Sequence, residues 1–298
     1  MDQEFAMWLV QLVAEGQLGH MKLRPPIAVL ATFLALILGV ISASNAYAQS
    51  VVATGQSFIT PRLLPGKVLE EGGRMAGLRL SLEPGWKTYW RSPGETGIPP
   101  KFDWSGSKNV RNLQLHWPSP QLFQSFGMRT AGYSDVVLFP LEVTPVDASL
   151  PIHLNLSADL GVCKEICVLE HVTAVLDVAP KDAEIGARQI RSALRRVPKP
   201  VESDIAQMQS CQFTGNGRDR QMVANLVLGD DVSKATVLIE NSQGLWIRDT
   251  RQSRTHTGLR LEVDVTLPKN LNWIDRSAFR MTILSDMGAY DLHGCSAS

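Results

Sequence analysis

Apolar and polar residues alternate in the stretch MAGLRLSL, residues 75–82, and the alternation returns in IHLNL, residues 152–156. A period of two is typical of β-strands, because successive side chains of a strand point to opposite faces of the sheet. The dipeptide PG breaks these runs at residues 84–85 and 93–94. Turn signals at such short intervals favour an antiparallel sandwich over alternating strands and helices. We therefore predict an all-β fold that begins with an immunoglobulin-like β-sandwich.

The pattern changes between residues 179 and 200. Apolar residues recur there at helical spacing among arginines, Asp182 stands where it could cap a first turn, and Pro198 lies near the end. We predict a helical connector in this segment. After the connector the alternation returns in MVANLVL (222–228) and LRLEVDV (259–265). This return predicts a second small β-sandwich domain.

The first 48 residues have the pattern of an export leader. The positively charged MKLR (21–24) precedes an uncharged apolar run over residues 27–41, and AYA (46–48) supplies the small residues that a signal peptidase reads. We predict a cleaved signal peptide and a mature chain that does not span the membrane. An uncleaved membrane anchor is the alternative. Export would place the chain in an oxidising compartment, where disulfides form.

The predicted organisation has four parts. They are an upstream extension with the signal peptide (1–48), the immunoglobulin-like domain (49–180), a helical linker (181–200) and the second β domain (201–298).

Composition and missing motifs exclude several classes of protein. Lys plus Arg equals Asp plus Glu at 29 each, so the chain lacks the excess positive charge that a nucleic-acid partner would require. A hydrophobic content of 44% with 19% charged residues is typical of a globular chain. The hydrolase motifs GxSxG and HExxH do not occur, and neither does the thioredoxin motif CxxC. We therefore expect neither a hydrolase of these classes nor a thioredoxin fold.

Four cysteines follow the leader, and their spacing sorts them into two pairs. Three residues separate Cys163 from Cys167, whereas Cys211 and Cys295 open and close the second predicted domain. Three pairings are formally possible. We favour Cys163 with Cys167 and Cys211 with Cys295, because each bond then stays within one predicted domain.

The short spacing of the first pair requires a turn. Residues four apart on a straight strand lie roughly 13 Å apart, whereas a disulfide needs Cα atoms about 4.4 to 6.8 Å apart. Alternating runs lead into and out of this segment. Residues 164–166 are therefore expected to form a hairpin tip, with the two cysteines facing each other across it.

The two pairs suit different tasks. A bond that closes a long loop removes more unfolded-state entropy than one that closes a short loop, so Cys211 and Cys295 are expected to form a structural disulfide. Cys163 and Cys167 are the better candidates for exchange with other thiols. Two alternatives stay open for this pair: a structural staple, and a Cu(I) site in which His171 joins the two thiolates. The neighbours Lys164 and Glu165 act in opposite directions on a thiolate, so they leave open which sulfur attacks.

Several motifs occur together in a fixed order along the first domain. They are EPGWKTYWRSPG (83–94), GIPPKFDW (97–104), GY (132–133) and CKEICV (163–168). This set resembles the N-terminal periplasmic domain of the thiol:disulfide interchange protein DsbD family, particularly the version in suppressor of copper sensitivity protein B. The resemblance covers roughly residues 57–178.

The resemblance implies a function for the first cysteine pair. Cys163 and Cys167 would accept electrons from a membrane-embedded thiol donor and pass them to periplasmic thioredoxin-fold proteins, without a bound cofactor. We expect no membrane electron-conducting domain in this chain, so the donor would be a separate membrane protein. The rival hypothesis is a periplasmic copper-binding or copper-tolerance protein that uses the same cysteines.

The family also has a cap loop whose aromatic residue shields the disulfide. The stretch FQSFG (123–127) occupies its place, so the resemblance makes Phe126 the candidate shield, with Phe123 beside it. Two features differ from the family: three residues separate the cysteines where five are usual, and Gln124 and Ser125 are neutral where the cap loop is acidic.

Four aromatic residues of the first domain are expected in its core rather than on a partner-binding surface, because large rings contribute most of the burial in a small sandwich. They are Trp86, Tyr89, Trp90 and Trp104.

Overall fold

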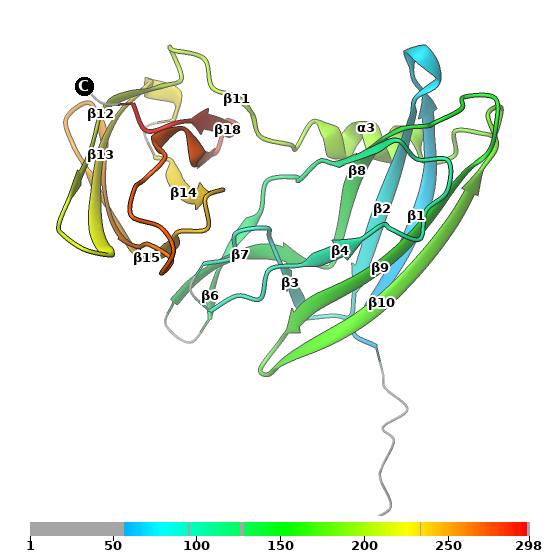
Figure 1. Ribbon diagram of the computed structural model, residues 1–298, viewed down its shortest axis with the longest axis horizontal. Helices are drawn as coiled ribbons and strands as arrows, with labels where there is room; N and C mark the ends of the chain where they lie inside the picture. Colours follow the sequence, from blue (N-terminus) through cyan, green and yellow to red (C-terminus); the bar gives the residue numbers. More distant parts are fainter. Residues whose placement is uncertain (1–56, 95, 126–127, 233, 297–298) are drawn as a thin grey trace, which may run out of the picture. The chain divides into compact units, whose positions relative to one another are not determined.

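The computed structural model describes residues 57–94, 96–125, 128–232 and 234–296 (Figure 1). These residues belong to one compact unit. The predicted signal peptide lies outside them. Within the described ranges, no helix is long and apolar enough to cross a membrane.

Two antiparallel sheets form the first sandwich. The first sheet has the strand order β1-β2-β8-β5. Its strands are β1 (Ile59–Val68), β2 (Arg74–Leu82), β5 (Asn112–Leu115) and β8 (Val136–Thr144), and the short 3-10 helix η1 (Glu70–Gly72) joins β1 to β2.

The second sheet of this sandwich has the order β10-β9-β3-β7-β6, and a short strand β4 also pairs with β9. Its strands are β3 (Lys87–Tyr89), β4 (Lys101–Asp103), β6 (Gln121–Ser125), β7 (Met128–Ser134), β9 (Ile152–Cys163) and β10 (Cys167–Val178). The hairpin of β9 and β10 is long and lies at one edge of the sheet (Figure 1).

The core of the first sandwich follows from the alternation in the sequence. Every second residue of β9 from Ile152 to Leu160 is buried, and the residues between them are partly exposed. Trp90 and Phe139 are fully buried among these aliphatic side chains. The prediction of an immunoglobulin-like sandwich from period-two alternation is confirmed.

The helix of the connector is shorter than the sequence predicts. Helix α3 (Ala187–Leu194) begins after Gly186, and Asp182 does not cap it; the Asp182 carboxylate instead accepts a hydrogen bond from the backbone N–H of Ala179. The buried guanidinium of Arg74 donates to the carbonyl oxygens of Ala179 and Asp182, which holds this stretch in a non-helical path. The prediction of a cap at Asp182 is therefore wrong.

Helix α3 packs against the first sandwich. Ile190 and Ala193 are buried against Leu64, Met75 and Leu138 of the sheet β1-β2-β8-β5. Ile185, which the helical period places on the apolar side, is 79% exposed because it precedes the helix.

A second sandwich follows, built from two four-stranded sheets with the orders β11-β18-β17-β14 and β12-β13-β16-β15. A separate core of buried aliphatic and aromatic residues lies between them. The strands are β11 (Lys199–Pro200), β12 (Ala206–Thr214), β13 (Asp219–Leu228), β14 (Thr236–Asn241), β15 (Trp246–Arg254), β16 (Gly258–Thr266), β17 (Phe279–Ser285) and β18 (Gly288–His293), with 3-10 helices η2 (Asp230–Val232) and η3 (Arg276–Ala278).

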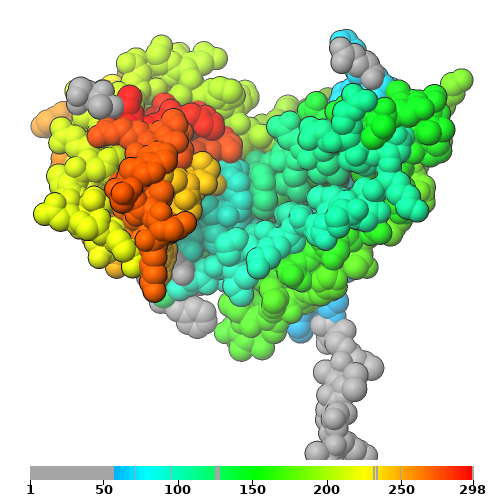
Figure 2. Space-filling view, in the orientation of Figure 1, coloured from blue at the N-terminus to red at the C-terminus, as the bar shows by residue number. Residues whose placement is uncertain are grey.

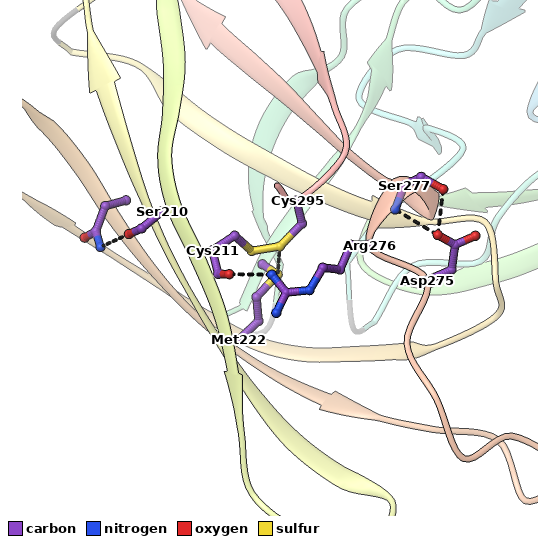
Figure 3. Close-up of a disulfide and its surroundings, with 8 residues drawn as sticks. Ser210, Cys211, Met222, Asp275, Arg276, Ser277 and Cys295 are labelled. Atoms are coloured by element: carbon purple, nitrogen blue, oxygen red, sulfur yellow. Dashed lines mark hydrogen bonds between the residues drawn. A yellow bond between two sulfur atoms is a disulfide. The ribbon is translucent and has the colours of Figure 1, made fainter. Parts of the chain in front are cut away.

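A disulfide between Cys211 and Cys295 lies inside this second core (Figure 3). Both cysteines are fully buried, and the sulfur of Cys295 lies 3.9 Å from that of Met222. Arg276 donates a hydrogen bond of 2.7 Å to the carbonyl oxygen of Cys211. The bond thus ties the first long strand of the sandwich to its C-terminal end.

Candidate active site at the Cys163–Cys167 hairpin

Cys163 ends β9 and Cys167 begins β10. The two residues are direct partners in the antiparallel register, their Cα atoms lie 4.1 Å apart, and their sulfurs form a disulfide. The three residues between them make the turn, which a hydrogen bond from the Lys164 N–H to the Ile166 carbonyl closes. The prediction of a hairpin tip at residues 164–166 is confirmed. Figure 2 shows this tip, drawn in green, at the surface of the molecule.

The two sulfurs differ in their access to solvent. Cys163 is 8% exposed, whereas Cys167 is exposed, together with the tip residues Lys164, Glu165 and Ile166. An attacking thiolate must approach a disulfide along its S–S axis to reach one of its sulfurs. Of the two cysteines, Cys167 is the one exposed to an incoming thiolate.

Tyr89 lies beside the disulfide. Its hydroxyl oxygen is 2.9 Å from the sulfur of Cys163 and 3.5 Å from the sulfur of Cys167. Burial raises the pKa of the Tyr89 phenol above its ordinary value. The hydroxyl therefore keeps its proton at neutral pH, and it can donate a hydrogen bond to a thiolate when the disulfide is reduced.

Glycines make room for the Tyr89 ring. A Cβ atom at Gly161 would lie 3.0 Å from Cδ2 of Tyr89 and 2.7 Å from Cβ of Ile98, and a Cβ at Gly97 would lie 2.9 Å from Cδ1 of Tyr89. The ring is therefore held between β9 and the loop after β3. This packing fixes the hydroxyl against the sulfurs.

The hairpin of β6 and β7 brings Phe123 to the same site. Lys87 is the register partner of Cys163, and its ammonium group lies 4.5 Å from the centre of the Phe123 ring. Phe123 thus contacts Lys87, the residue that pairs with Cys163 across the sheet. The other predicted cap residue, Phe126, lies outside the described residues.

Two lysines are neighbours of Cys163, one in the sheet and one in the chain. Lys87 is its neighbour on β3, and the ammonium group of Lys164 lies 3.5 Å from the carbonyl oxygen of Pro84. Nearby cations favour a thiolate over a thiol.

His171 does not share a site with the cysteines. Its register partner is Asp159, whose carboxylate lies 2.8 Å from Nδ1 of the imidazole. His171 lies four positions after Cys167 on the strand, roughly 13 Å away on an extended chain. Among the described residues, no group of three or more His, Cys, Asp or Glu side chains could hold a metal ion.

Two exposed apolar side chains lie near Cys167. Ile166 is 65% and Leu169 is 63% exposed, and Leu169 lies on the same face of β10 as Cys167, two residues along the strand. Exposed apolar groups that adjoin a reactive group indicate a protein-binding surface.

Residues 60–179 match the family model described as thiol:disulfide interchange protein DsbD, N-terminal. This region is therefore similar to the N-terminal domains of the DsbD family. The family supports a thiol:disulfide interchange role for the domain in general. Among the described residues of this matched region, the only cysteines are Cys163 and Cys167.

Fourteen solved chains also match. One is the N-terminal periplasmic domain of ScsB from Proteus mirabilis, which is 24% identical. The match covers 80% of this chain and 92% of that chain with a TM-score of 0.59, so the shared fold extends beyond residues 60–179. No curated protein matches.

Sequence reasoning placed Tyr89 in the core and missed its contact with the disulfide. The sequence does contain an indication that Tyr89 lies outside the core. Tyr89 and Trp90 are adjacent in an extended segment, so their side chains point to opposite faces. Only one of them can fill the core.

Proposed function

We propose that this chain is a periplasmic protein-disulfide reductase that exchanges disulfides through Cys163 and Cys167. The observation that carries the proposal is a disulfide at a hairpin tip with one buried and one exposed sulfur. A thiol donor in the membrane reduces the pair, and thioredoxin-fold proteins of the periplasm oxidise it again. The DsbD N-terminal family and the predicted leader support this location and these classes of partner.

Reduction begins when a donor thiolate attacks the sulfur of Cys167. A bond forms between the donor and Cys167, the Cys163–Cys167 bond breaks, and Cys163 leaves as a thiolate. The hydroxyl of Tyr89, 2.9 Å away, donates a hydrogen bond to this new charge. A second donor thiolate then attacks the donor's own sulfur in the mixed disulfide and releases Cys167, so that two electrons have passed to the pair.

Transfer to the acceptor repeats these steps in reverse. The thiolate of Cys167 attacks the disulfide of a thioredoxin-fold protein and forms a mixed disulfide. The thiolate of Cys163 then attacks Cys167, re-forms the intramolecular bond and releases the acceptor as a dithiol. Cys167 is thus the contacting cysteine and Cys163 is the resolving cysteine in both directions.

Trapping experiments test these roles. In a Cys163→Ser variant, Cys167 keeps its exposed thiol but nothing resolves its mixed disulfide. Mixing this reduced variant with an oxidised thioredoxin-fold protein should give a covalent complex that non-reducing electrophoresis and mass spectrometry detect. The Cys167→Ser variant is the matched control, because its remaining thiol is buried and should trap at least about tenfold less.

Equal trapping by the two variants would contradict the assigned roles. Absence of trapping by both, in folded variants, would contradict disulfide exchange itself and leave the pair as a structural staple. Each variant is checked for folding by circular dichroism before the reaction.

A further inference from the structure

A partly buried ion pair joins the two sandwiches close to the candidate active site. Arg91, two residues after Tyr89, donates from Nε and Nη2 to the two carboxylate oxygens of Glu240 on β14, and the shortest distances are 2.8 Å. The two side chains are 13% and 16% exposed. Bidentate geometry and burial separate this pair from exposed surface ion pairs, which contribute little to stability.

Aromatic and polar side chains contact the Arg91–Glu240 pair. The guanidinium of Arg91 lies 4.0 Å over the ring of Trp90, which is fully buried. Its Nη2 also lies 3.4 Å from the hydroxyl of Thr282, which donates to Asp291. Asp291 in turn pairs with Arg280. Two arginines and two carboxylates therefore balance their charges across the two sandwiches.

The segment that carries Arg91 also carries Tyr89, which contacts the disulfide. The backbone N–H of Trp90 bonds to the carbonyl of Ala131 on β7, so the chain from Tyr89 to Arg91 is fixed at its middle. Tyr89 faces the sulfurs at one end and Arg91 faces Glu240 at the other. The Arg91–Glu240 pair therefore restrains one end of the short segment whose other end positions Tyr89.

We infer that Glu240 is a positioning residue for the redox pair: by binding Arg91, the second sandwich holds the Tyr89 hydroxyl against Cys163 and favours the reduced state. This inference rests on the proposed exchange function and assigns a regulatory role to the second sandwich. The two sandwiches are then coupled, since stabilising the thiolate strengthens the pair between Arg91 and Glu240, and loss of that pair favours the disulfide.

A double-mutant cycle in glutathione redox buffer tests the coupling. The measured quantity is the equilibrium constant for reduction of Cys163–Cys167, obtained by alkylating free thiols and counting them by mass spectrometry. Glu240→Gln should lower this constant about fivefold, within the range of measured coupling between sites. In a Tyr89→Phe background the same substitution should have no effect, because Glu240 acts through that hydroxyl.

Matched variants separate positioning from loss of charge or of fold. Glu262→Gln removes a partly buried carboxylate of the second sandwich that pairs with Arg260 and Arg251 rather than with Arg91, and it should leave the constant unchanged. The charge exchange of Arg91→Glu with Glu240→Arg should restore a constant that either substitution alone lowers. If Glu240→Gln does not fold, Glu240→Asp, which keeps the charge but shortens the reach, takes its place.

Two results would overturn the inference. One is an unchanged constant in Glu240→Gln while Tyr89→Phe lowers it, and the other is additive effects in the double variant. If the wild-type pair does not equilibrate with glutathione at all, the proposed function fails instead. The cycle thus distinguishes failure of the coupling from failure of the exchange.

Discussion

The alternation of side chains along a strand gives two neighbouring residues opposite tasks. Trp90 is fully buried in the core of the first sandwich, whereas Tyr89 crosses to the other face and meets the sulfurs of the disulfide. The core residue fixes the backbone, and the backbone fixes the hydroxyl. The burial of Trp90 in the core thus helps to position the neighbouring Tyr89 against the disulfide.

Tyr89→Phe should raise the pKa of the Cys163 thiol by about one to two units. A hydrogen bond to a charged group contributes about 1.5 to 3 kcal/mol, and one pKa unit corresponds to about 1.4 kcal/mol. The measurement is the pH dependence of alkylation of Cys163 in a reduced Cys167→Ser background.

Tyr133→Phe is the control for this measurement. It makes the same chemical change at a buried tyrosine whose hydroxyl donates to the carbonyl of Pro118 rather than to sulfur. An equal rise of the thiol pKa in both variants would show that the effect does not come from the contact with Cys163.

The two strands of the β9–β10 hairpin differ in their place in the sheet. β9 pairs on both sides, whereas β10 lies at the sheet edge, with exposed residues at alternate positions. The exposed positions Cys167, Leu169 and Val175 share one face of β10, but only the first two adjoin the disulfide. The edge strand therefore offers a reactive sulfur and an apolar contact surface side by side.

Leu169→Asp should slow exchange with a thioredoxin-fold protein about tenfold, because it places a charge in the apolar surface that the partner covers. Exchange with glutathione, which does not need this surface, should change less than about twofold. The measurement is the second-order rate of reduction by each thiol, followed by quenched alkylation.

Val175→Asp is the matched control on the same face of the same strand. Val175 is 57% exposed, but it lies eight residues from Cys167. Equal slowing by the two substitutions would refute a docking surface at Leu169.

At the level of elements, local patterns carried much of the prediction. Period-two alternation predicted strands β2, β9, β13 and β16, and the spacing of Cys163 and Cys167 predicted the hairpin tip. The helix cap failed because Arg74, more than 100 residues earlier, binds the carbonyls of the segment. The Arg91–Glu240 pair joins residues 149 apart in sequence, and no local pattern indicates such a partner.

Over the whole molecule, burial divides the two disulfides. Cys211 and Cys295 are both fully buried in the second core, whereas Cys167 is exposed at a hairpin tip. The sequence reached this pairing by spacing, but spacing could not show which sulfur faces solvent. A reductant can therefore reach the Cys163–Cys167 bond in the folded protein, whereas the Cys211–Cys295 bond becomes accessible only when the second sandwich unfolds.

Mild reduction of the native protein should therefore open Cys163–Cys167 alone. After treatment with dithiothreitol and alkylation, mass spectrometry should find both of these cysteines labelled and Cys211 and Cys295 unlabelled. In urea sufficient to unfold the chain, all four should be labelled. Labelling of all four at the same rate under native conditions would contradict the division of tasks between the two bonds.

The direct register of Cys163 and Cys167 has a kinetic consequence. The cysteines are the last pair of the β9–β10 ladder, which runs from them to Val178 and Ile152, so the paired strands keep their thiols neighbours after the bond is cut. Ring closure between such neighbours proceeds at a high effective molarity. Mixed disulfides between the intact protein and its partners should therefore be short-lived. Capturing these partners in cells will require a variant that lacks the resolving cysteine, Cys163.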